Sequence, residues 1–296
     1  MNHLEVPVFS PSSARQVAAL GAHRIELNAA GSYGEGGLTP SLVELSDLLL
    51  STTAAATTTS HTHSHQRLPV RVMIRPRGPP PAPSADFIYT AQELEAGMRD
   101  AIVAFKESNL LDAELGDGFV FGVLKQQSSA DELGGDDDAG RSLVAIDVDR
   151  NRELVRLAQP FTCVLHRAFD DVVGSTDREE AALARALNDV VACGFGGILT
   201  SGGPGNAPNN VETLRCIVRL ASARNIEIIA GGGVRARNAQ GVIRDALRAQ
   251  GSSDCGDGVV RWLHSSCLAS SAVRGGGDRE IDKSEVTSLL QVLRHG

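Results

Sequence analysis

Short apolar runs alternate along this chain with longer stretches in which apolar residues recur at helical spacing. Runs of four to eight such residues bounded by turn residues are typical of strands, and the longer periodic stretches are typical of amphipathic helices. The expected strands are residues 4–9, 24–28, 70–74, 118–124, 161–166, 197–200, 226–230 and 259–264. The expected helices are residues 11–20, one from about 39, then 90–108, 149–159, 176–193, 210–223, 237–250 and 283–294.

Strands that alternate with helices indicate a parallel sheet, because each helix carries the chain back to start the next strand. Eight such units in succession predict a closed (β/α)8 barrel of the TIM type. The alternative is an open, doubly wound sheet. Its usual phosphate fingerprint, G-x-G-x-x-G after the first strand, is absent here, where the first strand is followed by SPSS.

Three segments do not fit the repeat, and we expect them to be loop insertions in a single domain spanning residues 1–296. Residues 51–67 are rich in Ser, Thr and Ala, residues 78–86 are rich in proline, and residues 126–142 carry five acids between Asp131 and Asp138. The first insertion contains His61, His63 and His65, a spacing that can chelate a divalent metal. A solvated loop is the simpler interpretation, because ordering it would cost backbone entropy.

Composition narrows the range of functions. The formal net charge is −8, and aromatic residues make up 4% of the chain, so neither a basic face nor a base-stacking surface for nucleic acid is expected. The five cysteines are scattered without a C-x-x-C pair, which is typical of reduced thiols in a reducing compartment. No signal peptide or run of 18 apolar residues is evident, and we therefore expect a cytoplasmic protein without a membrane partner.

Functional residues of a barrel lie at the carboxyl ends of its strands. Polar residues at these ends include Glu26, Arg75, His166 and Asp170. Period-two alternation turns Glu26, Arg75 and His166 toward the barrel interior, where Glu26 and Arg75 are expected to pair. His166 would serve as general acid or base, and Asp170 would fix its tautomer or cap the next helix. The plainer alternative is that the Glu26–Arg75 pair only fills the end of the barrel.

Further strand ends predict an anion site. Many barrels bind phosphate after the last two strands, where backbone N–H groups and a short helix meet the ligand. The chain carries glycines and serines in these places, and arginine forks match carboxylate and phosphate. The expected anion-binding residues are Arg77, Ser201, Gly232, Gly233, Ser265 and Ser266.

The motifs RIELNAAGSYGEGGLTPS, IRPRG, HRAFD, LTSGG, AGGGV and HSS occur in this order along the chain. Together they resemble the copper homeostasis protein CutC family over nearly the whole length apart from the insertions. The resemblance implies a TIM-type barrel, a cytosolic location, dimers or tetramers, and a role in copper homeostasis through Cu(I) binding.

The chain departs from the family pattern at the family's cysteines. Pro7 and Val8 stand where many members carry cysteines in the first strand, and Asn28 stands at the cysteine position of the second. Cu(I) prefers thiolate or thioether ligands. Only Cys267 lies near the strand ends, with His264 as a neighbouring ligand. Two hypotheses follow: a Cu(I)-binding copper homeostasis protein, and a barrel enzyme for a small anionic substrate. A third is a scaffold without chemistry.

Overall fold

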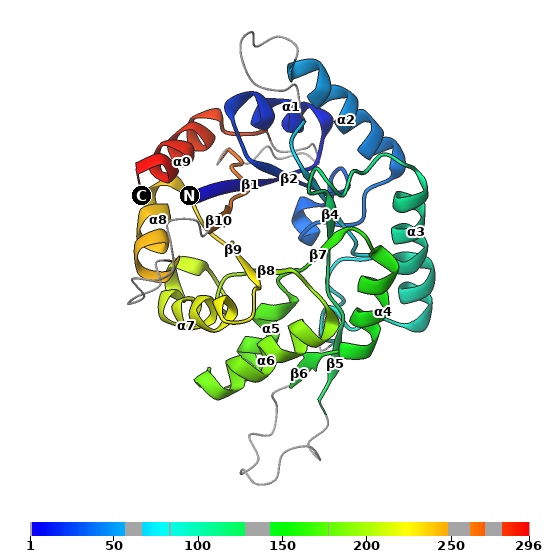
Figure 1. Ribbon diagram of the computed structural model, residues 1–296, viewed down its shortest axis with the longest axis vertical. Helices are drawn as coiled ribbons and strands as arrows, with labels where there is room; N and C mark the ends of the chain where they lie inside the picture. Colours follow the sequence, from blue (N-terminus) through cyan, green and yellow to red (C-terminus); the bar gives the residue numbers. More distant parts are fainter. Residues whose placement is uncertain are drawn as a thin grey trace.

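The computed structural model describes residues 2–56, 67–82, 84–127, 143–176, 178–247, 261–269 and 280–295. Eight parallel strands close into a barrel in the order β1-β10-β9-β8-β7-β4-β3-β2. Figure 1 looks along this barrel and shows the helices as a ring around it. The predicted (β/α)8 barrel is therefore confirmed, and the open doubly wound sheet is excluded. The barrel strands are β1 (Asn2–Val8), β2 (Arg24–Leu27), β3 (Val70–Met73), β4 (Gly118–Phe121), β7 (Thr162–Leu165), β8 (Gly197–Thr200), β9 (Glu227–Ala230) and β10 (Arg261–His264).

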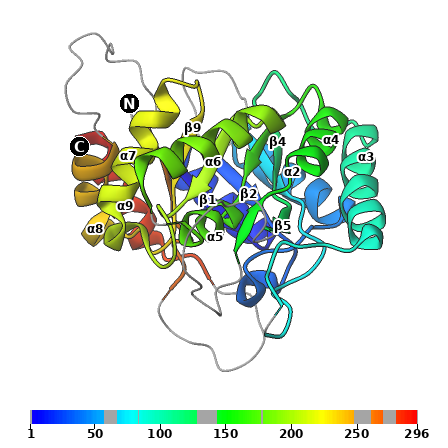
Figure 2. The same ribbon diagram turned by 90° about the horizontal axis from the view of Figure 1, so that it is seen from below.

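The helical ring is made of nine α-helices with two π-helical and two 3₁₀ segments in the described part of the chain. Figure 2 shows these helices packed along the outside of the sheet. None of the described helices is long and apolar enough to cross a membrane. The α-helices are α1 (Pro11–Leu20), α2 (Leu42–Ala56), α3 (Asp100–Glu107), α4 (Val148–Ala158), α5 (Ala168–Gly174), α6 (Glu180–Cys193), α7 (Val211–Ser222), α8 (Ala236–Val242) and α9 (Lys283–His295). The π-helical segments are Glu93–Arg99 and Ile243–Leu247, and the 3₁₀ segments are Ser32–Glu35 and Ala207–Asn209.

Helix α1 shows how local sequence sets the boundaries of these elements. Ser10 caps its first turn by accepting a hydrogen bond from the Ser13 N–H, and Pro11 occupies the first helical position, where its missing N–H costs nothing. Gly21 ends the helix in the left-handed region at φ 97° and donates its N–H to the carbonyl of Ala18.

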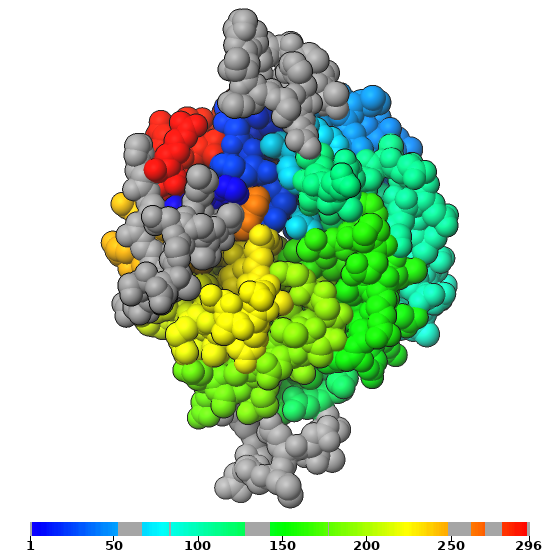
Figure 3. Space-filling model, in the orientation of Figure 1, coloured from blue at the N-terminus to red at the C-terminus, as the bar shows by residue number. Residues whose placement is uncertain are grey.

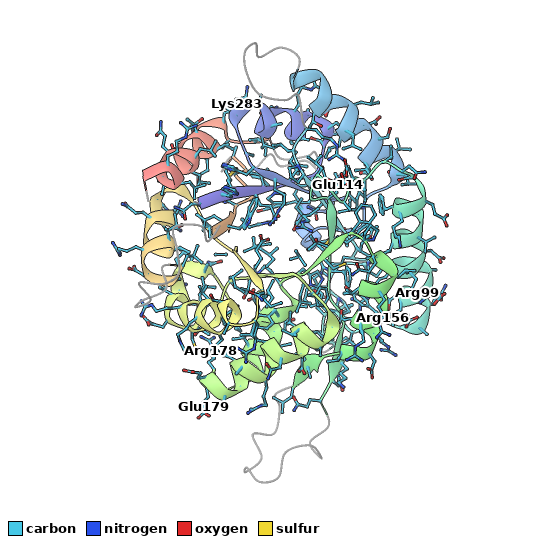
Figure 4. All side chains as sticks on the ribbon, viewed as in Figure 1. Arg99, Glu114, Arg156, Arg178, Glu179 and Lys283 are labelled. Atoms are coloured by element: carbon cyan, nitrogen blue, oxygen red, sulfur yellow. The ribbon has the colours of Figure 1, made fainter. Side chains whose placement is uncertain are left out.

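Alternation along the strands separates two apolar layers. Inward side chains of six strands form a small cluster inside the barrel, and outward side chains pack under the helices. The inner cluster consists of Met73, Val120, Val164, Leu199, Ile229 and Trp262. Many charged side chains lie on the outside of the helical ring, among them Arg99, Arg178 and Glu179 (Figure 4). The space-filling view in the same orientation shows the closely packed surface that the ring forms (Figure 3).

Two features were not predicted, a hairpin of two short strands and a short helix. The expected strand 118–124 ends at Phe121, and the chain then forms an antiparallel hairpin of β5 (Leu124–Gln126) and β6 (Val144–Ile146). The short helix α5 follows β7 directly, within the HRAFD motif. Both were missed because three-residue strands and one- to two-turn helices leave little periodic signal.

The insertions are described only in part. Residues 51–56 continue helix α2 instead of leaving it, so that part of the first expected insertion is wrong. His61, His63, His65 and the acidic residues 131–138 lie outside the described residues. The proline-rich segment ends at Asp86, which accepts hydrogen bonds from the barrel, as shown below. The single-domain assignment stays a prediction.

The two ends of the chain lie next to each other, as Figure 1 shows at the left of the ring. Strand β1 pairs with β10, the last strand, over four residue positions from Asn2 to Glu5. The Asn2 side-chain amide donates a hydrogen bond to the Leu293 carbonyl of α9 at 3.3 Å.

Candidate active site at the barrel mouth

We call the end of the barrel where the strands terminate the mouth. Four charged or titratable side chains enter the barrel from β1, β2 and β10: Glu5, Arg24, Glu26 and His264. Glu5 lies between the other two strands, with Arg24 opposite it on β2 and His264 opposite it on β10. Glu5, Arg24 and Glu26 are buried, and the His264 side chain is 13% exposed. This charged group stands beside the apolar inner cluster, because period-two alternation places all four residues inward.

Arg24 neutralises one carboxylate of this group. Its Nε donates to Glu5 Oε2, and its terminal nitrogens donate to Glu227 Oε1 at 3.1 and 3.2 Å. The guanidinium also lies 3.7 Å from the centroid of the Trp262 ring, a favourable cation–π contact. Arg24 therefore has its donors and its π-face satisfied within the barrel.

The remaining three groups form a compact set of potential ligands. Glu5 Oε1 lies 2.8 Å from His264 Nδ1, and Glu26 Oε1 accepts a hydrogen bond from the Asn28 amide at 3.2 Å. Glu26 Oε2 is buried and has no partner. One ligand atom from each of Glu5, Glu26 and His264 lies within 4.8 Å of the others.

The two carboxyl groups differ in their electrostatics. Burial alone would raise the pKa of Glu5, but the Arg24 guanidinium and His264 outweigh it and lower that pKa to about 2. Burial raises the pKa of Glu26, which lacks such a cation in contact. Burial lowers the pKa of His264, and the attraction of Glu26 and Glu5 outweighs it, so that its pKa is raised. The raised pKa values of Glu26 and His264 both favour a bound proton on one of these two groups.

The expected pair of Glu26 with Arg75 is wrong. Arg75 donates to Asp86 Oδ2 at 2.8 Å and to the carbonyls of Glu35 and Gly37, so its terminal nitrogens are used by the loop after β2 and by the proline-rich segment. Its Nε is buried without a partner. The pairing failed because Arg75 lies beyond the end of β3, where it reaches loops and not the strand interior.

His166 is buried under Phe87, with ring centroids 4.5 Å apart, and Arg75 stacks on the same phenyl ring at 5.1 Å. Phe87 adopts φ 60°, which is unfavourable for a bulky residue. Burial, and then the charge of Arg75, lower the pKa of His166 to about 3, so the imidazole is neutral at pH 7. Its Nδ1 accepts from the Ala168 N–H at 3.3 Å, which places the proton on Nε2. The geometry thus favours a neutral hydrogen-bond donor over the expected general acid or base.

Asp170 does not fix the tautomer of His166. Its carboxylate accepts hydrogen bonds from the Ser201 N–H at 3.0 Å, from the Ser201 and Thr200 hydroxyls and from Arg167 Nε at 2.8 Å. It therefore ties α5 to the end of β8. This network also commits Ser201, one of the expected anion-binding residues, to a protein partner.

The other expected anion-binding residues follow the ends of three strands, β3, β9 and β10. Arg77 is occupied by Glu93 at 2.6 Å and by Asp86 at 3.6 Å. Gly232 and Gly233, after β9, adopt φ 85° and 71°. Ser265 and Ser266, after β10, accept from Arg235 at 2.9 and 3.0 Å. Arg235 was not predicted, although it directly follows the AGGGV motif.

Comparison with known proteins identifies the fold and the lineage. The family model described as the CutC family matches residues 2–252. The chain belongs to the CutC family. A family protein CutC of Xanthomonas campestris pv. campestris strain B100 is 30% identical over 303 aligned positions, covering 98% of each chain. The human protein named copper homeostasis protein cutC homolog is 30% identical over 240 positions, 81% of this chain and 68% of the human one.

A solved structure, that of the putative copper homeostasis protein CutC from Streptococcus agalactiae, aligns with a TM-score of 0.63. It is 23% identical and covers 90% of this chain and 99% of its own. This likeness supports the fold of the CutC family and agrees with the closed barrel described above.

Three of the four described cysteines are deeply buried. Burial raises the pKa of Cys163, Cys193 and Cys267 to about 12 each in the metal-free protein. The fourth, Cys216, is half-buried on α7. Cys163 belongs to the outer apolar layer under the helices. Cys267 is buried at φ 48°, and the group of potential ligands around His264 contains the two glutamates without it. Cys255 lies outside the described residues.

Three residues in or near the barrel had no role assigned from the sequence, and one of them, Arg24, lies toward the end opposite the mouth, where β2 and β9 begin. Glu5 interrupts the otherwise apolar run LEVPVF, and an acid in the middle of such a strand was the available signal. Arg24 shares the inward face with Glu26, yet its partners lie on strands far away in sequence. Asp86 belongs to a segment that appeared to be only a loop.

Proposed function

We propose that this member of the CutC family is an enzyme that binds a small molecule carrying an anionic group and hydroxyls at the barrel mouth. One observation carries the proposal: polar atoms at this end are buried and have no hydrogen-bond partner among the described residues. Four of them are Glu26 Oε2, Asn28 Oδ1, Arg75 Nε and His166 Nε2, and the hydroxyl of Tyr89, beside Arg77, is a fifth. Each of these residues is at most 3% exposed. A buried polar atom without a partner costs about 1–3 kcal/mol, so several together favour a bound ligand that satisfies them.

The hydrogen-bonding character of these atoms describes the ligand. Arg75 Nε and, in the tautomer above, His166 Nε2 are donors, which suit a carboxylate, phosphate or carbonyl oxygen. Asn28 Oδ1 is an acceptor, which suits a hydroxyl. Glu26 Oε2 is the free oxygen of a carboxyl group, and we assign it the exchange of a proton with the substrate.

Arg235 supplies charge for the anionic group. It is half-buried, and its described contacts are the hydroxyls of Ser265 and Ser266 and the carbonyl of Val234. No ion pair among the described residues involves it, in contrast to Arg75, Arg77 and Arg167. It stands after β9, at the end of the barrel where many barrels of this type bind anionic groups.

Isothermal titration calorimetry of chelator-treated protein with inorganic phosphate and with glycolate tests this function. We expect the parent to bind, Arg235→Gln to weaken phosphate at least tenfold, and His166→Asn to weaken glycolate by a similar factor. Arg150→Gln, an exposed arginine on α4, is the matched control and should bind as the parent does. Equal heats for all four proteins, or no heat with the parent, would refute the proposal.

Copper homeostasis through Cu(I) binding is the second candidate, favoured by the name of the human relative. It is tested by titrating reduced protein with Cu(I) against a competing chelator, in the parent, in Cys267→Ser and in a variant with His61, His63 and His65 replaced by Gln. Loss of binding in either variant would support Cu(I) handling by those groups. Absence of binding in the parent would exclude direct handling of Cu(I).

We further propose a cytoplasmic homo-oligomer. The described cysteines are free, in keeping with a reducing compartment. Helix α2 exposes Val43 at 67% and Leu50 at 70%, two apolar side chains seven residues apart and so on one helix face. Such a face is suited to contact a second copy of the chain. Light scattering measures the mass, and a monomer at micromolar concentration would contradict the proposal.

A further inference from the structure

We infer that Glu5, Glu26 and His264 form a binding site for a divalent transition-metal cation inside the barrel, and that this site does not serve Cu(I). The three residues come from three adjacent strands, β1, β2 and β10, so the barrel itself brings them together. The inference does not depend on the ligand proposed above, although both use Glu26.

Geometry supports a metal site. One carboxylate oxygen from each glutamate and a ring nitrogen of His264 lie within 4.8 Å of one another. Ligands of a tetrahedral cation such as Zn²⁺ lie about 2.0–2.2 Å from it, so any two of them are about 3.3–3.6 Å apart. The longest separation in the group would therefore shorten by roughly 1 Å when the ion binds. Glu5 Oε1 and His264 Nδ1, at 2.8 Å, are already as near as two ligands on one ion.

A second observation points into the same space. Glu26 Oε2 has no hydrogen-bond partner, and its residue is only 3% exposed. Its other oxygen accepts from the Asn28 amide, which orients the carboxyl group and leaves Oε2 for a ligand. Protein metal sites regularly contain such hydrogen bonds, which orient the ligating side chains toward the ion.

Charge also favours a cation. Two buried carboxylates share one guanidinium and one imidazole, since Arg24 binds Glu5 through Oε2 and His264 Nδ1 lies against Glu5 Oε1. Glu26 takes part in no ion pair among the described residues, and a buried charge needs a partner. Arg24 is itself shared with Glu227, which prevents full neutralisation of Glu5 by the arginine.

The donor set selects the ion. Two carboxylates and an imidazole are hard and borderline ligands, suited to Zn²⁺, Mn²⁺, Fe²⁺ or Cu²⁺, whereas Cu(I) prefers sulfur. No described cysteine belongs to the group. With three protein ligands the ion keeps at least one open position, as in catalytic metal sites.

The test titrates chelator-treated protein with Zn²⁺ against a chromophoric chelator at pH 7, with Co²⁺ as a spectroscopic probe. The run His61, His63 and His65 is a rival site, so a variant with all three replaced by Gln is included. We expect one tight Zn²⁺ per chain in the parent and in this triple variant. Glu26→Gln and His264→Gln should each weaken it at least tenfold, while the exposed control Glu212→Gln should not.

Circular dichroism checks that Glu26→Gln, an isosteric change, is folded, and Glu26→Asp should keep part of the affinity because it keeps the carboxylate. Loss of the tight site in the triple histidine variant together with its survival in Glu26→Gln would overturn the inference, as would absence of stoichiometric Zn²⁺ binding. Cu(I) should bind the parent no tighter than it binds Glu26→Gln. The phosphate and glycolate titrations are made on metal-free protein and test the proposed function. Their outcome therefore does not depend on whether Zn²⁺ binds.

Discussion

Replacing Arg24 by Met should destabilise the protein strongly, because it leaves Glu5 buried without its cation. The two side chains are 4% and 1% exposed, so water cannot take over the lost contact. Removing one partner of a buried ion pair typically costs about 3–5 kcal/mol. Met keeps most of the aliphatic length of arginine, which limits the loss of packing on Trp262. At about 2.1 cal/mol/K per residue the unfolding entropy of this chain is about 0.6 kcal/mol/K, so such a loss lowers the unfolding midpoint by roughly 5–8 °C.

Differential scanning calorimetry at pH 7 measures the effect, with two comparisons. Arg219→Met removes a pair with Glu180 in which the side chains are 54% and 60% exposed, and it should change the unfolding midpoint far less than Arg24→Met does, because water screens the pair. The double change Glu5→Gln with Arg24→Met should recover part of the loss, because the uncompensated charge is gone. If Arg24→Met costs no more than Arg219→Met, then Glu5 is not held as an ion by Arg24, and the electrostatics derived for the barrel interior are wrong.

Three further outcomes are expected. The pKa of His166 falls from 6.5 to about 3 on folding, so its contribution to stability is fully present above pH 6.5 and is lost as the pH drops toward 3. In urea titrations at a series of pH values, the free energy of unfolding of His166→Gln should therefore fall less steeply between pH 6.5 and 3 than that of the parent. Gly37→Ala should cost about 1–3 kcal/mol, because Gly37 has φ 89° and the new methyl would lie 2.1 Å from an asparagine side-chain oxygen, whereas Gly31→Ala meets nothing within 4 Å and should cost less in the same thermal scans. Replacing Val43 and Leu50 together by Glu should lower the mass found by light scattering toward that of one chain, and an unchanged mass would remove α2 as the interface.

The barrel architecture could be predicted from the sequence because the alternation of strand and helix patterns repeats eight times. Eight alternations of strand and helix leave few topologies, and the period of two within each strand fixes which side chains enter the barrel. Glu26 was placed inward for this reason, and it does lie in the interior beside His264. Several boundaries shifted by one to four residues: α2 begins at Leu42 in place of the expected residue 39, and α6 begins at Glu180 in place of 176.

The partners of the site residues were beyond the reach of the sequence. Arg75 was assigned to Glu26 because both lie at strand ends, but the guanidinium reaches Asp86, whose position depends on the path of a proline-rich segment. Asp170 was assigned to His166 across four residues, yet it binds Ser201 from the next strand. Each side chain at the barrel mouth has several possible partners within reach, and the three-dimensional path of the loops determines which one it contacts.

The group of Glu5, Glu26 and His264 spans the seam at which the first and last strands of the barrel meet. During synthesis, β1 and β2 emerge early, while His264 follows more than 230 residues after Glu26 in the printed sequence. Contacts of such long sequence separation form late in folding. The cluster therefore does not exist in an incomplete or unclosed chain, and whatever it binds can be acquired only once the cylinder has shut.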